Sequence, residues 1–542
     1  MNKHLFLLIF TWLFTIYVQA QQSVRIIPQP NKVEEKQGQL QLKNTLTIVT
    51  THTELFQLTN YAVNMFEDDF KLQTHVQSES TGNQVVRFKL DKNKNAQDAY
   101  KLNVGKQGID IISATEQGLF YGLQTLRQLI SSDGKVQYVK IDDTPRFGWR
   151  AFMLDEGRYF QGKAQVLKLL DEMARLKMNV FHWHLVDDQG WRIEIKKYPK
   201  LTQVGSKRPS TQVGPLKWNS PIQSGESHAG FYTQEDIKEI VKYAQKRHIT
   251  IVPEIEMPGH SSAAIAAYPW LGTSGKDIDV PIWFGVSKDV YNVADPRVYN
   301  FLTDVLDEVI TLFPSKVIHI GGDEAKYDHW QKSDFVKNYM KENNLKTFAD
   351  LQVVFTNRIS NYLESKGRRM MGWNEILGHN VHDYQSDKDT GAEKELSKSS
   401  VIHFWRGDIK LMTSAAENGY DIVNSLHSET YLDYDYKNIP LKKAYNFNPI
   451  PQGLDQKYHN RIKGLGCQMW GEWIPKSGYM DFMTFPRIAA YAEVGWTQED
   501  NKDYEAFKLA LQPILKEWEQ KSIFYAPMEF AEPGFGKWVK PN

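Results

Sequence analysis

The stretch VIHIGGDE, residues 317–324, is a short apolar segment that ends in two glycines and two adjacent carboxylates. The same order recurs from Arg146 onward: an apolar strand, a polar loop and an amphipathic helix. We predict eight such strands, at Phe152–Leu154, Val180–Leu185, Ile249–Ile255, Val317–Ile320, Arg368–Gly372, Val401–Phe404, Asp421–Asn424 and Gly464–Met469. Eight strands that alternate with helices over about 350 residues predict an α/β fold, a (β/α)8 TIM barrel.

The chain on either side of the barrel predicts further units. Before the barrel, short β-branched segments alternate with two helices, Leu55–Phe70 and Thr115–Ile130, as in a small α/β domain. The segments are Leu46–Val49, Val85–Leu90 and Ile109–Ile112. The turn-rich residues 142–145 (DDTP) mark the boundary. We therefore expect an N-terminal α/β domain over residues 21–145, the barrel over residues 146–500, and a C-terminal helix and tail over residues 501–542 that pack on the barrel.

The first residues have the pattern of a signal peptide. Lys3 and His4 precede an apolar run, Leu5–Tyr17, and Val18-Gln19-Ala20 then offers small residues for cleavage before Gln21. The apolar run is too short to span a bilayer comfortably. We expect residues 1–20 to be removed and the protein to be exported, periplasmic or extracellular, soluble and without membrane insertion.

The composition narrows the class of ligand. Lys+Arg and Asp+Glu both number 65, so the formal charge is zero, which argues against nucleic-acid binding. The chain has 15 Trp, 26 Tyr and 27 Phe, which either fill a large core or stack on an apolar-faced ligand such as a sugar. Cys467 is the only cysteine, so an intrachain disulfide and a cysteine metal site are excluded.

Ionisable residues follow three consecutive predicted strands. The second strand continues as HWHLVDDQ (residues 182–189), the third as EIEMPGH (254–260) and the fourth as HIGGDE (319–324). The carboxyl ends of barrel strands meet on one face, where the active site of such a barrel is built. Burying so many carboxylates costs stability unless they are paired or used in chemistry. We therefore predict the active site there.

The adjacent pair Asp323-Glu324 indicates that the two carboxyl groups have different roles. Most glycosidases place two carboxylates about 5–9 Å apart across the scissile bond, which adjacent residues at one strand end do not easily do. One carboxyl, with its pKa raised by burial, suits a general acid, while the other orients a neighbouring group. The nucleophile then comes from elsewhere, and the 2-acetamido oxygen of an N-acetylated sugar is one candidate.

Three tryptophans lie at predicted strand ends: Trp373, Trp405 and Trp470 follow strands five, six and eight. Together they predict an aromatic box, which both an acetamido methyl group and a pyranose face would fit.

Six motifs in order resemble those of the glycoside hydrolase family 20 β-N-acetylhexosaminidases. They begin with residues 149–150 (WR), 153–155 (MLD) and 158–160 (RYF), and continue with HWHLVDDQGWR (182–192), PEIEMPGH (253–260), HIGGDE (319–324), MGWNE (371–375) and MWGE (469–472). The resemblance spans about Val24 to Trp496. It implies an enzyme without cofactor or metal that releases terminal, non-reducing, β-linked GlcNAc or GalNAc from glycans, with retention of configuration through an oxazoline intermediate.

The resemblance also implies roles for single residues. Glu324 would be the general acid, and Asp323 would hold the acetamido nitrogen. Tyr431 would donate a hydrogen bond to the acetamido oxygen, and Asp187 with His260 would form a relay that tunes Glu324.

Substrate binding would involve two further sets of residues. Arg150, Asp433 and Glu472 would bind sugar hydroxyls, and the three strand-end tryptophans would line the pocket. One departure concerns the leaving-group side, because Tyr434–Pro449 lacks the tryptophan that many members carry there; its aromatic residues after Tyr434 are Tyr436, Tyr445 and Phe447.

Two other readings stay open at this point. His182 and His184 alternate onto one strand face and, with Asp323, suit a metal-dependent barrel hydrolase that chelators would inactivate. A sugar-binding protein without activity would keep the tryptophan box and lose the acid, whereas this chain has Asp323 and Glu324. The residues fit GlcNAc or GalNAc as substrate, and either a monomer or a homodimer.

Overall fold

The computed structural model describes residues 24–92, 98–214, 218, 220–379, 381–382 and 391–532. The expected signal peptide, residues 1–20, and the end of the expected C-terminal tail lie outside these ranges. Within them, no helix combines the length and apolar character that crossing a membrane requires.

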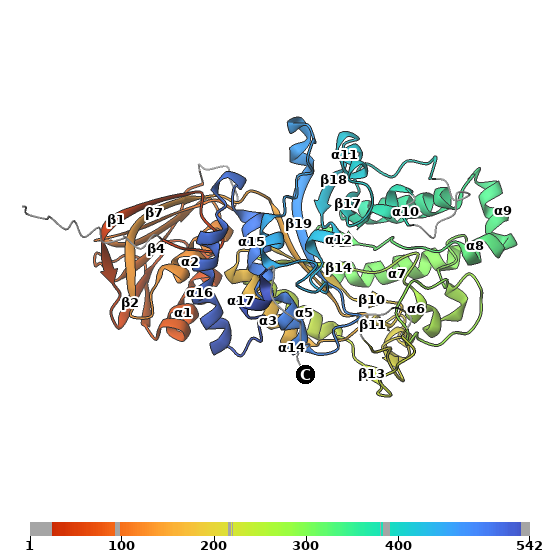
Figure 1. Ribbon diagram of the computed structural model, residues 1–542, viewed down its shortest axis with the longest axis horizontal. Coiled ribbons are helices and arrows are strands. Elements are labelled where there is room, and N and C mark those ends of the chain that lie inside the picture. The colour runs from red at the N-terminus through yellow and green to blue at the C-terminus, as the bar shows by residue number, and fades with distance from the viewer. Residues whose placement is uncertain are drawn as a thin grey trace, which may run out of the picture.

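A seven-stranded mixed sheet forms the N-terminal part of the molecule, at the left of Figure 1. Its order is β1-β7-β5-β6-β4-β2-β3. The strands are β1 (Lys32–Gln41), β2 (Thr45–Val49), β3 (Gln73–Gln77), β4 (Val85–Leu90), β5 (Tyr100–Gly105), β6 (Gly108–Ser113) and β7 (Lys135–Asp143). The β-branched segments at β2, β4 and β6 were predicted. Most residues of the edge strands β1 and β3 are partly or fully exposed, so their sequences lack a strong apolar signal.

Two helices lie between this sheet and the barrel, α1 (Phe56–Phe70) and α2 (Glu116–Leu129) (Figure 1). Every residue of α2 from Gly118 to Leu126 is buried, because one side packs on the sheet and the other on the barrel. Gly118 and Gly122 make the close approach possible, since a Cβ at either would overlap Ser113 or Ile111 of β6.

The barrel is closed and parallel, as predicted, in the order β14-β15-β16-β17-β18-β19-β8-β9. Its strands are β8 (Trp149–Asp155), β9 (Val180–His184), β14 (Thr250–Glu254), β15 (Val317–His319), β16 (Arg369–Trp373), β17 (Val401–Phe404), β18 (Asp421–Asn424) and β19 (Ile462–Met469). All eight overlap the predicted strands, and the fold class, a TIM barrel preceded by a small α/β domain, is confirmed.

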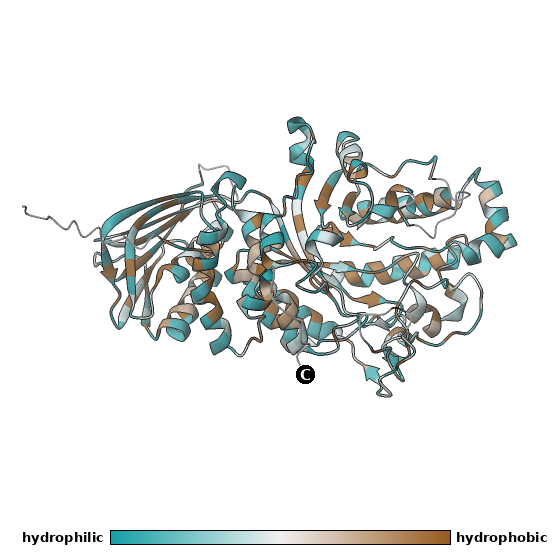
Figure 2. Ribbon diagram, viewed as in Figure 1, coloured by the Kyte–Doolittle hydropathy of each residue, from teal (hydrophilic) through white to brown (hydrophobic). Residues whose placement is uncertain are grey.

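Amphipathic helices surround the barrel, and Figure 2 shows apolar stripes alternating with polar ones along α7 (Pro296–Leu312) and α10 (Phe348–Ser365). Their starts follow capping chemistry. In α5 (Gln234–Gln245) the Thr233 hydroxyl accepts from the Asp236 N–H at 3.1 Å, and the Asp236 carboxylate accepts from the Thr233 N–H at 3.2 Å. This is the capping box that the sequence predicts.

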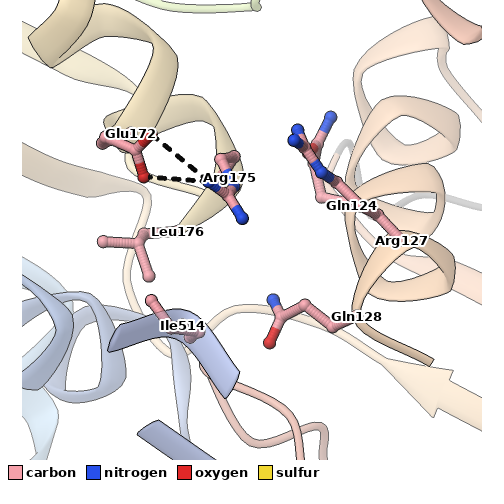
Figure 3. A pocket seen from close by; sticks show the side chains of 7 residues that line it. All are labelled: Gln124, Arg127, Gln128, Glu172, Arg175, Leu176 and Ile514. Atoms are coloured by element: carbon pink, nitrogen blue, oxygen red, sulfur yellow. Dashed lines mark hydrogen bonds and ion pairs between the residues drawn. The ribbon is translucent and has the colours of Figure 1, made fainter. Parts of the chain in front are cut away.

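The C-terminal helix α16 (Tyr504–Gln520) packs beside α2 and the barrel helix α3 (Lys163–Arg175). Figure 3 shows the junction, a cavity of about 10 Å³ that is large enough for about one water molecule. Glu172 of α3 binds the Trp518 indole at 2.7 Å and Lys521 at 2.8 Å. Although burial raises the pKa of Glu172, Arg175 and Lys521 outweigh it and lower that pKa to about 2.

Candidate active site

Glu254, the last residue of β14, is the centre of a buried cluster inside the carboxyl end of the barrel. Its carboxylate lies 2.8 Å from His182, 2.7 Å from His184 and 2.8 Å from His319, and accepts a 2.8 Å hydrogen bond from the Trp373 indole. Burial raises the pKa of Glu254, but the three histidines outweigh burial and hold that pKa well below its usual value. Glu254 is therefore an anion that ties four strands together. Glu254 was not among the predicted site residues.

From this cluster a chain of charged contacts runs to the loop after β9. His184 reaches Asp187 at 2.9 Å through its second ring nitrogen. Burial alone would lower the pKa of His184, but Glu254 and Asp187 raise it to about 10, so both ring nitrogens carry protons. Asp187 also binds the Arg158 guanidinium at 2.6 Å. Its other oxygen lies 3.2 Å from His260 Nδ1. The predicted partners Asp187 and His260 are thus in contact.

His260 connects this chain to the carboxylate pair. Its Nε2 lies 3.7 Å from Asp323 Oδ2 and 3.5 Å from Glu324 Oε2. The backbones of His260 (φ 45°) and Glu324 (φ 48°) are left-handed, a strained conformation for residues with side chains that is typical of functional sites. Gly321 (φ 67°) precedes the pair, and a Cβ there would overlap the Glu256 carboxyl group. The turn after β15 is thus shaped to place both carboxylates at one point.

The two carboxyl groups of the pair have opposite protonation tendencies. Burial raises the pKa of Asp323 to about 7. The charge of His260 lowers this pKa, whereas the charges of Glu375 and Glu324 raise it further. Its Oδ1 is buried and has no hydrogen-bond partner among the described residues. Burial also raises the pKa of Glu324, but the hydrogen bond and charge of His260, then His382 and Arg158, lower it overall. The expected acid is therefore the carboxyl that these protein groups favour as an anion.

The predicted aromatic box exists. Trp373, Tyr431 and Trp470 form one buried cluster with Met153, and Trp405 packs against it. The Trp373 and Trp470 rings are 5.8 Å apart, and Trp405 stacks on Tyr431 at 6.1 Å with 8° between the planes. Burial raises the pKa of Tyr431 well above its usual value, so its hydroxyl keeps its proton.

Two polar anchors belong to the Trp405 edge of the box. The Trp405 indole donates to Glu375 at 2.9 Å, and Glu375 also contacts His382 at 2.9 Å. Glu375 was not among the predicted site residues. It follows the strand-end Trp373 by two positions, which is the signal that could have identified it.

Asp433 and Glu472 bring two more carboxyl groups to the site. Burial raises the pKa of Asp433 well above its usual value, helped by the charge of Glu472. Burial also raises the pKa of Glu472 to about 7, although Arg158, 4.0 Å away, opposes it. The Asp433 Oδ1 atom is buried without a hydrogen-bond partner in the described part of the chain. These two groups suit the recognition of neutral hydroxyls.

Arg150 does not lie in this site, so that prediction is wrong. It is the second residue of β8, at the opposite end of the barrel from the carboxylates. Its guanidinium donates to the carbonyls of Phe147 (2.7 Å) and Lys177 (2.8 Å), to Asp98 (3.2 Å) and to the Tyr121 hydroxyl (3.1 Å). Tyr121 belongs to α2, so Arg150 joins the barrel to the N-terminal domain.

Arg158, three residues beyond the end of β8, is the arginine of the site. It contacts Asp187, Asp155 and Glu472. The sequence signal was its position, since residues just after a barrel strand face the site and residues at the strand start do not.

His182, His184 and Asp323, the trio of the metal-dependent alternative, do not form a ligand set. Among the described residues the groupings that could hold a cation are His182-Glu254-His319, His184-Glu254-Glu256, Asp187-Asp188-His260 and His260-Asp323-Glu324. None contains the trio. Both ring nitrogens of His184 contact carboxylates, so neither presents a free lone pair to a metal. The donor set therefore does not fit that alternative.

Residues 147–499 match the glycosyl hydrolase family 20 catalytic domain, and residues 23–144 match domain 2 of the same family. The chain is 34% identical over 527 residues to a beta-hexosaminidase of Porphyromonas gingivalis. That match covers 93% of this chain and 64% of the relative, so the chain spans less than two thirds of the relative's length.

Solved structures agree with these sequence matches. A β-N-acetylhexosaminidase from Bacteroides fragilis is similar with a TM-score of 0.79 and 29% identity, over 95% of this chain and 100% of that one. A family 20 exo-β-N-acetylglucosaminidase from Vibrio harveyi, solved with N-acetylglucosamine, has a TM-score of 0.80 and 29% identity, over 93% of this chain and 80% of that one. With the catalytic-domain match covering more than half of its length, the chain belongs to glycosyl hydrolase family 20.

Proposed function

We propose that this protein is a retaining exo-β-N-acetylhexosaminidase that removes terminal non-reducing GlcNAc or GalNAc from glycans and uses the substrate's own acetamido group as nucleophile. One observation carries the proposal. The buried, unpartnered oxygen of Asp323 lies in a carboxylate pair with Glu324, beside the tryptophan box. An amide N–H would satisfy that oxygen, and an acetamido methyl group would fit the box.

The chemistry then proceeds in two steps. Asp323 accepts the acetamido N–H, and the acetamido carbonyl oxygen attacks the anomeric carbon. The glycosidic bond breaks as Glu324 gives its proton to the leaving oxygen, which leaves an oxazolinium ion held by Asp323. Water then attacks the same carbon as Glu324 takes a proton from it and the ring opens. Two displacements at one centre retain the configuration.

Substrate binding would reverse the protonation order of the pair. The protein's own groups favour the proton on Asp323, with its pKa near 7, over Glu324, whose pKa is lowered. An acetamido N–H on Asp323 stabilises its anion and lowers that pKa. The sugar excludes water from Glu324, 21% exposed at its side chain, and raises its pKa. In the complex the single proton is thus favoured on Glu324, the residue that needs it as the acid.

The remaining groups hold the sugar and set charge. Asp433 and Glu472 accept hydroxyl protons, and Arg158 takes the role that was expected of Arg150. Tyr431 donates to the acetamido oxygen and holds it in line with the anomeric carbon for attack. Asp187, held as an anion by Arg158 and His184, keeps His260 in place against Glu324.

The comparison of Glu324→Gln and Asp323→Asn tests this function on aryl N-acetyl-β-glucosaminide and galactosaminide. Loss of acid catalysis predicts that Glu324→Gln lowers kcat/KM about 10²–10⁴-fold. Loss of the anion at the oxazolinium predicts about 10²–10³-fold for Asp323→Asn. Glu342→Gln is the matched control, because Glu342 is an exposed carboxyl on α9 (Asp334–Glu342). It should leave kcat/KM on both aryl substrates unchanged.

Product stereochemistry and inhibition distinguish this route from other hydrolases. Proton NMR of the first product should show the β-anomer, and a thiazoline analogue of the oxazoline should inhibit competitively. An α-anomer, or no inhibition by the thiazoline, would show that the acetamido group is not the nucleophile. The panel of aryl sugars and glycans also decides between GlcNAc and GalNAc. We further propose export with cleavage after Ala20, which N-terminal sequencing of the secreted protein tests.

A further inference from the structure

Two long loops on the carboxyl side of the barrel present aromatic side chains to solvent. Trp218 lies in the loop after β9 and is 57% exposed, and Trp283 lies in the loop after β14 and is 42% exposed. Trp473, just after β19, packs against both loops, since its ring lies 5.9 Å from Trp218 and 5.2 Å from Phe284. We call Trp218, Trp283 and Trp473 the aromatic platform; Phe284, 6% exposed, is buried against Trp473.

A buried glutamine fixes the two loops to each other. The Gln212 side chain, 1% exposed, accepts from the Phe284 N–H at 2.8 Å and donates to the carbonyl of Trp218 at 2.9 Å. Its backbone N–H donates to the carbonyl of Ile282 at 2.7 Å. These hydrogen bonds hold the platform in place, so binding a ligand there would cost little conformational entropy.

The platform borders the candidate active site on more than one side. Trp473 directly follows Glu472, and the Gln189 side chain, two residues after Asp187, donates to the carbonyl of Trp283 at 2.9 Å. The connection between β14 and α7, which carries Trp283, also carries His260. Its Lys288 binds Asp328, four residues beyond Glu324, at 2.7 Å. The platform thus lies on the same face of the barrel as Asp187, His260 and Glu472.

The loop after Asp433 does not offer such a surface. The Tyr436 hydroxyl donates to the carbonyls of Phe482 and Phe485, and its ring is buried. Tyr445 is buried against Tyr504 and Phe507, and Phe447 is buried as well. The aromatic residues of that loop after Tyr434 serve the core, and Tyr434 itself packs against the tryptophan box, so a stacking surface beyond the box needs a different element.

We propose that the aromatic platform is the leaving-group subsite, on which the pyranose rings next to the cleaved residue stack. The proposal rests on the proposed glycosidase function. It names the substrate class as β-linked N-acetylhexosamine oligosaccharides of two or more residues rather than small aglycones. The flat rings match the apolar faces of pyranoses, and the neutral sugars need no counter-charge there.

The test compares full-length wild type with Trp218→Ala/Trp283→Ala on two substrates. Phe335→Ala, on α9, is the matched control, because Phe335 is 54% exposed. For methyl N-acetyl-β-glucosaminide, whose leaving group has no ring to stack, we expect kcat/KM within twofold of wild type. For the β-linked GlcNAc trisaccharide we expect about a tenfold loss, mainly in KM, as typical for two lost aromatic contacts.

The same variants in a Glu324→Gln background separate this proposal from the proposed function. There, calorimetry measures binding without turnover. The double variant should weaken the trisaccharide about tenfold and leave GlcNAc unchanged, whether or not wild type hydrolyses either sugar. An equal loss on monosaccharide and trisaccharide, or no loss on either, overturns the platform. Failure of wild type to hydrolyse an aryl N-acetylglucosaminide would instead overturn the glycosidase function. A preference for a lipid-like aryl aglycone over the trisaccharide would also refute the sugar subsite.

Discussion

Replacing Arg158 or Arg150 by alanine separates the arginine of the site from the arginine of the domain junction. Arg158 is 8% exposed at its side chain and faces Asp187 at 2.6 Å, Asp155 at 3.3 Å and Glu472 at 4.0 Å. Its removal leaves these buried carboxylates without their cation and removes a charged hydrogen-bond donor from the sugar. Each charged hydrogen bond is worth about 1.5–3 kcal/mol, so one or two such contacts predict a loss of about 10²–10³ in kcat/KM.

Arg150→Ala should lower the stability of the fold and leave kcat/KM nearly unchanged. Arg150 is 1% exposed and bonded to two carbonyls, one carboxylate and one hydroxyl, so its loss should cost about 3–5 kcal/mol of folding free energy and lower Tm. Steady-state kinetics on an aryl N-acetylglucosaminide, measured below the unfolding transition of each variant, check the predicted effects on catalysis. Thermal unfolding checks the predicted effect on stability. A folded Arg150→Ala protein with KM raised tenfold or more, or Arg158→Ala with wild-type kinetics, would refute the assignment.

Four further outcomes follow. The pair Asp323-Glu324 holds one proton below the Asp323 pKa of about 7 and above the lowered pKa of Glu324, so kcat/KM should fall as pH rises through about 7; a profile still rising at pH 8 contradicts this. Tyr431→Phe should lower kcat about 10–10²-fold with little change in KM, because its hydroxyl aligns the acetamido oxygen with the anomeric carbon. The Glu172 pKa, lowered to about 2, contributes about 3 kcal/mol of stability that is present above its unfolded value and lost as pH falls through about 2; Glu172→Gln should flatten that acid limb in chemical denaturation. Prolonged dialysis against a chelator should leave kcat/KM within error, and a loss restored by added metal would revive the metal-dependent alternative.

The barrel was predictable because its strands are short, apolar on both sides and separated by clear turn and cap signals. All eight predicted strands exist within a few residues, and the capping box at Thr233 is present as predicted. Four strands of the N-terminal sheet were not predicted. Two of these, β1 and β3, are the edges of the sheet, where exposed polar residues conceal the period of a strand.

The site was partly predictable for the same reason. Asp187, His260, Asp323 and Glu324 follow consecutive parallel strands, whose carboxyl ends must converge. Arg150 was misplaced because a motif indicates that an arginine is needed and says nothing about which end of the strand presents it. Glu254 was overlooked because its importance lies in the number of its partners, which come from three other strands.

The amino-acid order alone determined the periodicity of the fold and which kinds of chemical group gather at one end of the barrel, since both follow from local pattern and from the parallel arrangement. Only the tertiary structure decided the protonation preference of Asp323 against Glu324, the two arginine assignments and the aromatic platform. Each depends on burial and on distances between residues far apart in the chain, because the electrostatic and stacking energies that act there fall off within a few ångströms.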